Sequence, residues 1–320
     1  MSSALDRHAR LRRFIPEPEW LLFEPLIEDI QRLKVQRKAL LLAHNYQTAE
    51  IFHGVADLQG DSLALARHAA RSDAAVLVMC GVRFMAETAK LLCPDKTVLL
   101  PDEQAGCSLA AAITPQDIRA LRHSYPTAPV VCYVNTSAAV KAECDVCCTS
   151  ANAVQVVKSL GVRRVILVPD EYLARYVAAR TSVEVIPWRG RCEVHERFTA
   201  REVAEYRSAS GAYVLAHPEC PEEVQRAADY VGSTAGMIDE LARRQPARAM
   251  LLTECSMADN VTVTQPQIEF VRPCNLCPHM KRITLANIRD CLERLSPAVE
   301  LPDDIAVPAR RTVLRMLDLV

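Results

Sequence analysis

The sequence predicts an α/β protein of three pseudo-repeated αβα three-layer domains, each with a short parallel sheet, around a pseudo-threefold axis. Three observations carry this prediction: a cysteine that recurs at a constant spacing, continuous apolar strands ahead of each cysteine, and segments of helical spacing between the strands. Continuous apolar strands that alternate with helices are typical of parallel sheets covered on both faces. The arrangement around an axis is a geometric inference from the equivalence of the three units.

The cysteine spacing reveals the repeat. Cys107, Cys192 and Cys277 follow one another at intervals of 85 residues. Each comes after a short β-rich run that ends at a proline. A fixed long period is the mark of a repeated structural unit rather than of a local motif.

Within each period the chain reads strand, helix, strand, helix, strand. The right-handed crossover between parallel strands brings the strand C-termini to one edge of a sheet. His44, Tyr133 and His217, which lie at the ends of the first strands, are therefore expected at that edge with the cysteine loops. The expected strands cover residues 40–45, 76–79 and 98–101, then 130–135, 165–168 and 183–187, then 213–219, 250–253 and 268–273.

The period also divides the chain into parts. We expect the C-terminal part to consist of an amphipathic helix and a tail that packs on the first unit. The expected parts are an N-terminal extension at 1–24, αβα units at 25–107, 108–192 and 193–277, and the C-terminal helix and tail at 278–320.

Composition excludes several classes of function. The chain has 320 residues, with 38 Lys and Arg against 39 Asp and Glu, so it offers no broad basic surface for nucleic acid. No apolar run approaches the roughly 18 residues of a membrane span, and the charged N-terminus does not resemble an export signal, which favours a cytoplasmic protein. The 9 glycines include no pair at the spacing of a Rossmann or P-loop motif, so neither nucleotide-binding class has sequence support.

The 13 cysteines suggest metal or redox chemistry, because thiols are kept reduced in the cytoplasm. One cysteine from each unit gives three thiolates that converge on the axis. A 4Fe–4S cluster is normally held by four cysteines, so three leave one iron open to act as a Lewis acid. The long and equal spacing favours such a central cofactor over zinc.

Other cysteine groups leave alternatives open. Cys144, Cys147 and Cys148 resemble half of a zinc site, but buried packing at a turn explains them as well. Cys274 lies three residues before Cys277 and can form either the other half of such a site or a redox pair with Cys277. Buried packing also explains the three cysteines that lie in apolar or amphipathic stretches, Cys80, Cys132 and Cys291.

The chain resembles the quinolinate synthase family between about residues 40 and 285. Motifs of the family occur in order, among them Cys192-Glu-Val-His-Glu-Arg-Phe and Cys277-Pro-His-Met-Lys. The matching stretches are 43–47, 60–63, 81–90, 105–109, 133–142, 147–153, 192–198, 217–219, 232–234 and 277–281.

The resemblance implies three αβα domains and a 4Fe–4S cluster held by Cys107, Cys192 and Cys277. It implies an enzyme of NAD biosynthesis that condenses iminoaspartate with dihydroxyacetone phosphate to give quinolinate, phosphate and two waters. Iminoaspartate hydrolyses readily, so transient delivery by an L-aspartate oxidase or dehydrogenase is expected.

Polar residues of the expected edge suit this chemistry. Helix starts are expected at Ser62, at Ser150 and at Ser233–Thr234, where the hydroxyls can bind phosphate or carboxylate, although they also serve as simple N-caps. By resemblance, Glu219 is the candidate general base for imine–enamine tautomerisation and dehydration, with His217, Tyr46 and His44 as further catalytic groups. The residues expected to contact substrate are His44, Ser62, Tyr133, Asn135, Ser150, His217, Glu219 and Thr234. Just after Cys192, His195 and Glu196 are expected to support the cluster from behind its ligands.

Two features depart from the family pattern. The last ligand is preceded only by Cys274-Asn-Leu, and we assign Cys277 because it alone keeps the period and the Cys-Pro step. Ser256 stands where the family usually has glycine.

Three other functions compete with this one. A reductive dehydroxylase of isoprenoid synthesis shares the three-cysteine architecture but needs an electron donor. An iron–sulfur sensor would not need the His217-Pro-Glu219 motif, and a zinc-stabilised structural protein would contain zinc instead of iron.

Overall fold

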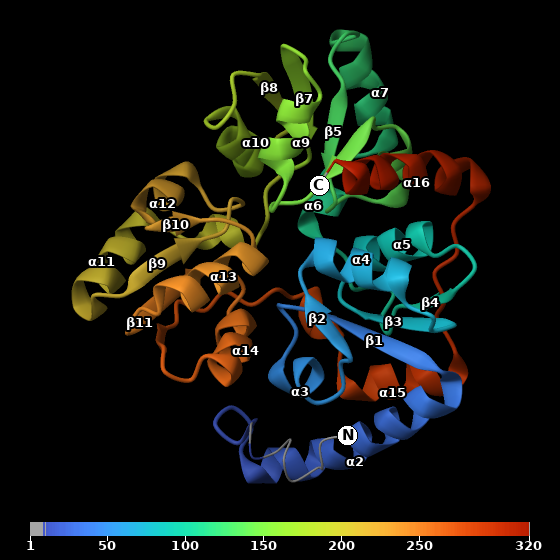
Figure 1. The fold of residues 1–320 in the computed structure, drawn as a ribbon, viewed down its shortest axis with the longest axis vertical. Helices are drawn as coiled ribbons and strands as arrows, with labels where there is room; N and C mark the ends of the chain where they lie inside the picture. Colours follow the sequence, from blue (N-terminus) through green and yellow to red (C-terminus); the bar gives the residue numbers. More distant parts are fainter. Residues whose placement is uncertain (1–8, 10, 320) are drawn as a thin grey trace.

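Three αβα units surround a common centre (Figure 1). The structure, a computed structural model, describes residue 9 and residues 11–319. Each unit holds one four-stranded parallel sheet, with helices between the strands. The predicted fold class is therefore confirmed.

The three sheets share one topology. The first strand of each unit lies next to the third, so these two strands form the buried middle of the sheet. The strand orders are β2-β1-β3-β4, β6-β5-β7-β8 and β10-β9-β11-β12. The strands are β1 (Ala39–His44), β2 (Leu58–Gly60), β3 (Val76–Cys80) and β4 (Thr97–Leu99); β5 (Val130–Tyr133), β6 (Val146–Cys148), β7 (Arg164–Val168) and β8 (Glu184–Pro187); and β9 (Tyr213–Ala216), β10 (Tyr230–Val231), β11 (Arg248–Leu252) and β12 (Glu269–Val271).

The prediction of three strands per unit is corrected to four. The missed strand is an edge strand, β2, β6 or β10, of only two or three residues. Such a short strand has too few residues to show a hydrophobic period, and it is held by pairing to the strand beside it.

Helices cover the sheets and carry their own start signals. Thr114, Thr199 and Thr284, again 85 residues apart, each form a capping box that begins the helix after a cysteine loop. The helices are α3 (Ala49–Phe52), α4 (Ser62–Arg71), α5 (Arg83–Leu92), α6 (Ser108–Ala111), α7 (Pro115–Ser124), α8 (Ala138–Ala142), α9 (Ala153–Ser159), α10 (Glu171–Ala178), α11 (Ala200–Ser210), α12 (Glu222–Ala227), α13 (Thr234–Arg244) and α14 (Ser256–Thr264), with 3₁₀ turns η1 (His195–Arg197) and η2 (Met280–Arg282).

The cysteine loops are equivalent in backbone detail. A hydrogen bond of 2.7–3.2 Å joins the start of the helix after each middle strand to the residue two positions before the cysteine, from Arg83 to Ala105, from Glu171 to Gly190 and from Cys255 to Asn275. A second set closes a helical turn after each cysteine, because its carbonyl accepts from the amide four residues later. The 85-residue period is thus a repeat of structure as well as of sequence.

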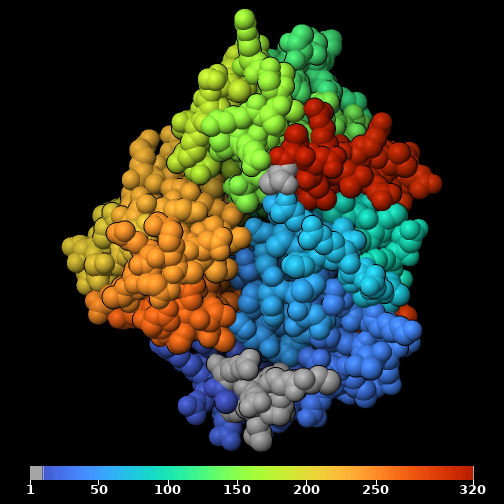
Figure 2. All heavy atoms as spheres, in the orientation of Figure 1, coloured from blue at the N-terminus to red at the C-terminus, as the bar shows by residue number. Residues whose placement is uncertain are grey.

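The N-terminal helix lies on the first unit, and the two C-terminal helices lie on the first and second units. Helix α2 (Glu17–Arg37) packs against α15 (Leu285–Arg294), which also contacts β3. Helix α16 (Asp303–Asp318) lies against α8 and β6 of the second unit and α5 of the first, and its surface fills the seam between them (Figure 2).

The hydrophobic core is continuous through the first two units and the C-terminal helices, while the third unit has a separate cluster on each face of its sheet. In the described part of the chain, no helix is both long enough and apolar enough to cross a membrane.

Candidate active site

All twelve residues that the sequence singles out as site residues line one cavity at the centre of the three units. The cavity holds about 740 Å³ of empty space, its mouth included. The twelve are His44, Tyr46, Ser62, Cys107, Tyr133, Asn135, Ser150, Cys192, His217, Glu219, Thr234 and Cys277.

The first strand of each unit delivers one side chain to this cavity. His44 is the last residue of β1, Tyr133 is the last of β5, and His217 directly follows β9. These strands are paired on both sides and buried, so their ends are fixed in position. All three side chains are at most 6% exposed.

His44 and His217 have the same local hydrogen bonding. The Nδ1 atom of His44 accepts from the Tyr46 amide at 3.2 Å, and that of His217 accepts from the Glu219 amide at 3.3 Å. Burial lowers the pKa of each ring to about 3, although the charge of Glu219 opposes this. Both rings are therefore neutral at pH 7 and are assigned a proton on Nε2, where they act as hydrogen-bond donors.

Glu219 is the buried carboxylate of the cavity. Its Oε1 accepts from the Tyr133 hydroxyl at 2.7 Å and from Asn135 at 3.4 Å, and its Oε2 lies 2.8 Å from His195 Nδ1. Burial opposes ionisation, but the rings of His217 and His195 and the hydrogen bonds from His195 and Tyr133 hold the pKa of Glu219 below its ordinary value. The carboxylate is thus ionised and surrounded by donors.

A chain of hydrogen bonds leads from Tyr46 to Glu219. The Tyr46 hydroxyl lies 2.6 Å from Thr253 Oγ1, which lies 2.9 Å from His195 Nε2. His195 then contacts Glu219 through Nδ1, and the same nitrogen lies 3.1 Å from Cys192 Sγ. Burial and the charge of Glu219 raise the pKa of Tyr46 well above its usual value, so its hydroxyl keeps its proton.

Two of the three predicted hydroxyls stand at helix starts. Ser62 and Thr234 are the first residues of α4 and α13, whose caps are the preceding Asp61 and Ser233. The helix start predicted at Ser150 is wrong: this residue lies in a turn, and α9 begins at Ala153. The reason is local: the side chain of Asn152 accepts from the Thr149 amide at 2.7 Å, and the Thr149 carbonyl accepts from the amides of Asn152 and Ala153, so a closed turn precedes the helix. Ser150 Oγ instead lies 3.2 Å from His217 Nε2.

The donor set at the three cysteines suits an iron–sulfur cluster. Cys107, Cys192 and Cys277 are partly buried, line the cavity and are not disulfide-bonded. Burial raises the pKa of Cys107 to about 12, and raises that of Cys192 and Cys277 as well. A thiolate in such a buried place is stabilised by nearby cations such as metal ions. Cysteine thiolates are also the usual ligands of iron–sulfur clusters. Ligand atoms of Cys192, His195 and Glu219 also lie within 4.8 Å of one another.

Comparison with known proteins decides the family. The model of the family described as quinolinate synthetase A protein matches residues 28–318. The chain belongs to the quinolinate synthetase A protein family. The resemblance that the sequence motifs indicated is confirmed.

Curated relatives from this quinolinate synthase family match over nearly their whole length. The chain is 62% identical over 318 residues to quinolinate synthase 1 of Mesorhizobium japonicum, which covers 99% of this chain and 98% of that protein. It is also 62% identical over 318 residues to quinolinate synthase of Agrobacterium fabrum, with 99% and 92% covered. The protein of the same name from Xylella fastidiosa is 58% identical over 318 residues, with 99% and 93% covered.

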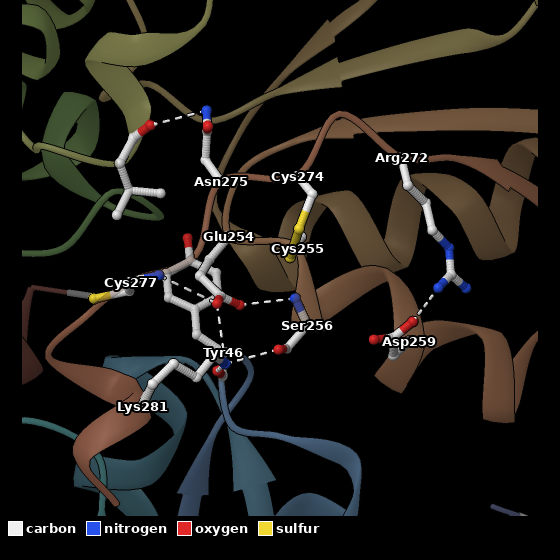
Figure 3. Close-up of a disulfide and its surroundings, with 11 residues drawn as sticks. Tyr46, Glu254, Cys255, Ser256, Asp259, Arg272, Cys274, Asn275, Cys277 and Lys281 are labelled. Atoms are coloured by element: carbon white, nitrogen blue, oxygen red, sulfur yellow. Dashed lines mark hydrogen bonds and ion pairs between the residues drawn. A yellow bond between two sulfur atoms is a disulfide. The ribbon is translucent and has the colours of Figure 1, made fainter. Parts of the chain in front are cut away.

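The other cysteines lie in different surroundings from Cys107, Cys192 and Cys277. Cys274 forms a disulfide with Cys255, so it does not pair with Cys277 (Figure 3). Cys144, Cys147 and Cys148 are buried at or beside β6, where the Sγ atom of Cys147 lies 3.3 Å from that of Cys132. The buried packing expected for Cys80, Cys132 and Cys291 is confirmed.

The sequence reasoning missed Thr253 and Glu254, and it treated His195 only as a support of the cluster. Thr253 joins Tyr46 to His195, while Glu254 is fully buried and lines the cavity. Both directly follow β11, at the edge where strand C-termini converge. His44, Tyr133 and His217 were selected because they lie at the ends of the first strands. The same criterion, applied to the ends of the middle strands, would have selected Thr253 and Glu254.

Proposed function

We propose that this protein is a quinolinate synthase that condenses iminoaspartate with dihydroxyacetone phosphate to quinolinate, phosphate and water in NAD biosynthesis. The observation that carries the proposal is the convergence of twelve residues from three units on one cavity. A cavity in which three thiols and several neutral donors surround the Glu219 carboxylate suits two small anionic substrates and a cluster.

Cys107, Cys192 and Cys277 would hold a 4Fe–4S cluster, one from each unit. With three protein ligands, such a cluster offers one iron as a Lewis acid that stabilises a departing hydroxyl. His195 supports this assignment, because its ring lies 3.1 Å from Cys192 Sγ and is fixed by Thr253 and Glu219.

Substrate anions would be bound by neutral donors and helix starts. Ser62 and Thr234 place hydroxyls at the N-termini of α4 and α13, where the helix dipole favours phosphate or carboxylate. The Nε2 protons of His44 and His217 and the amide of Asn135 add donors, and Ser150 extends the His217 group.

Glu219 would take the proton in tautomerisation and dehydration. In the resting site it is a weak base, because the Tyr133 hydroxyl and His195 lower its pKa. When the Tyr133 hydroxyl donates to a substrate oxygen instead, one of these bonds is lost and the carboxylate becomes a stronger base. The chain from Tyr46 through Thr253 and His195 would relay a second proton to Glu219, with each group accepting a proton from the side of the substrate as it donates one onward, so that Tyr46 ends protonated.

The proposal extends to the surroundings of the enzyme. We place it in the cytoplasm, without nucleic acid or membrane partners, as its balanced charge suggests. Iminoaspartate is short-lived in water, so an L-aspartate oxidase or dehydrogenase would deliver it in a transient encounter.

Anaerobic purification followed by metal analysis and a quinolinate assay tests the proposal. We expect about four irons and four sulfides per chain, and quinolinate only when both substrates are supplied. Zinc in place of iron would indicate a structural metal protein, and a cluster without turnover would indicate a sensor. A need for an external electron donor would favour the reductive dehydroxylase.

A further inference from the structure

The junction between the third cysteine loop and the first unit contains an ion pair that the proposed function does not use. Lys281 and Glu254 meet with an Nζ–Oε1 distance of 3.0 Å, and their side chains are 21% and 0% exposed (Figure 3). A carboxylate without solvent exposure needs such partners, because burial of an unpaired charge is costly.

Lys281 binds three groups from two segments of the chain, the connection between β11 and α14 and the loop after β1. Besides Glu254, its ammonium group donates to the Tyr46 carbonyl and to Ser256 Oγ, both at 2.7 Å. Tyr46 belongs to the first unit and follows β1, whereas Ser256 begins α14 of the third unit. All three donor directions of the ammonium are therefore used across the junction.

Glu254 holds the other side of the junction. Its Oε1 accepts from the backbone amide of Cys277 at 3.3 Å, and its Oε2 accepts from the amide of Ser256 at 2.8 Å. One carboxylate thus connects the end of β11, the start of α14 and the third cysteine. Through Lys281 the same carboxylate is connected to the backbone of Tyr46.

The internal repeat shows that this pair is a special feature of the third unit. Lys281 occupies the position four residues after its cysteine, where the other units have Ala111 and Glu196, both exposed. Glu254 corresponds to Asp170 in the second unit, because each forms a bridge with the residue two positions before the cysteine. Asp170 is buried too, but its Oδ2 has no hydrogen-bond partner, so no lysine meets it.

We propose that Glu254 and Lys281 are a positioning pair that sets Cys277 and Tyr46 at a fixed distance across the junction of the third and first units. The proposal rests on the proposed function, in which Cys277 is a cluster ligand and Tyr46 faces the substrate. The pair acts through the backbone, since it contacts the Cys277 amide and the Tyr46 carbonyl rather than the thiol or the hydroxyl.

Three variants test the pair: Lys281→Met, Glu254→Gln and the double variant that carries both. Lys281→Met leaves a buried carboxylate without its ion-pair partner. The double variant avoids this problem, because it removes both charges and leaves neither one buried alone. Arg282→Gln is the matched control. It removes a cation from the same turn, but its partner at 3.0 Å is Asp102 and its side chain is 40% exposed.

The first readout uses apoprotein and requires no cluster. The alkylation rate of Cys277 by iodoacetamide is measured by peptide mass spectrometry, with Cys192 in the same sample as internal reference, because Arg282 binds Asp102 and Gln104 in the loop of Cys107. We expect the Cys277 to Cys192 rate ratio to rise roughly tenfold in each of the three variants, because the loop opens more often, and to stay unchanged in Arg282→Gln. An unchanged ratio in the double variant overturns the proposal.

The second readout uses reconstituted enzyme. We expect iron loss to a chelator to become roughly 10–100-fold faster in each single variant, as is typical when a residue that orients a metal ligand is replaced. We also expect kcat to fall by a larger factor than KM rises. The double variant should lose iron no faster than the faster of the two single variants, because the two residues act as one unit. Additive effects would contradict a pair. If wild-type protein itself holds no cluster, the proposed function fails, whereas wild-type-like variants on a loaded enzyme defeat only the pair.

Discussion

At the scale of single residues, Glu219 is the group on which the proposed chemistry depends most. It is 3% exposed and receives donors from Tyr133, Asn135 and His195. Glu219→Gln keeps the shape but removes the proton acceptor, so we expect turnover to fall by roughly 10²–10⁴. The absorption spectrum of the cluster should stay normal.

Glu240→Gln is the control for that change. Glu240 is 8% exposed and is held by Arg243 in α13, outside the cavity lining. Its replacement should leave quinolinate formation within about twofold of wild type, as is usual for changes away from a reacting group. Equal turnover in wild type and Glu219→Gln would make Glu219 a scaffold residue.

The cysteines give a second prediction at this scale. Serine at Cys107, Cys192 or Cys277 removes a soft ligand, so we expect loss of iron and of activity. Cys274→Ser breaks only the bond to Cys255 and should retain the cluster. Iron content and visible absorption after anaerobic purification measure both effects, and iron retained in Cys277→Ser but lost in Cys274→Ser reverses the assignment.

The buried histidines predict a pH dependence of stability. Burial lowers the pKa of His217 from 6.5 to about 3, so between these values the unfolded chain binds a proton there that the folded chain does not. The free energy of unfolding therefore falls as pH falls below about 6.5, by up to about 1.4 kcal/mol per pH unit for this group. His217→Gln lacks this contribution, and chemical unfolding of apoprotein from pH 7.5 to 5 should show a shallower loss. Parallel pH profiles would contradict the prediction.

At the scale of elements, the starts of α4 and α13 present hydroxyls to the cavity, while neighbouring residues cap the helices. Thr234→Val keeps the volume and leaves the Ser233 cap in place, but it removes a donor from a site proposed for anions. A hydrogen bond to a charged group contributes about 1.5–3 kcal/mol, so KM for the affected substrate should rise roughly tenfold or more.

The thermal stability of that variant should fall only modestly, because the cap is intact and the one lost internal hydrogen bond is that from buried Asn45 Nδ2 to Thr234 Oγ1, at 2.9 Å. Thr114→Val removes a helix cap outside the cavity lining and serves as the opposite control, with lowered stability and unchanged KM. A large loss of stability in Thr234→Val, with KM unchanged, would assign that hydroxyl to the helix rather than to the substrate.

The elements also show how far sequence reasoning reaches. The buried strands could be predicted because four to six apolar residues in a row leave a clear pattern, as in β1 and β3. The edge strands could not, since β10 has only two residues and is defined by its pairing with β9. The start of α9 was missed because the side chain of one asparagine decides it.

At the scale of the whole molecule, the period of 85 residues explains how the chain closes into a ring. The capping box at Thr284 begins α15 as those at Thr114 and Thr199 begin α7 and α11, so α15 is the opening helix of a further repeat. No fourth sheet follows in the described chain, and α15 packs on α2 and β3 of the first unit.

The convergence of the cysteines was predictable from this period, because equivalent loops leave equivalent strand ends. The place of α16 across the first two units was not, since an amphipathic helix does not encode which apolar surface it covers. The pairing of Cys255 with Cys274 likewise joins two loops whose proximity only the folded third unit defines.

The arrangement of three units around one centre leads to the last prediction, which concerns the number of cysteine ligands available at that centre. Three units supply three cysteines to the centre, so a cubane cluster there has one iron without a protein thiolate. Quinolinate and related dicarboxylates that offer two oxygens, or an oxygen and a ring nitrogen, should bind that iron and change the EPR or Mössbauer signal of the loaded enzyme. Inhibition should be strongest for compounds with this chelating geometry, because a Lewis acid with open positions prefers them. The same open site should make the cluster lose an iron in air faster than a cluster with four cysteines.

If the spectrum of the loaded enzyme does not respond to quinolinate or to a dithiol chelator, a protein group caps the fourth iron. His195 is then the first side chain to replace, because it already lies beside Cys192 and Glu219.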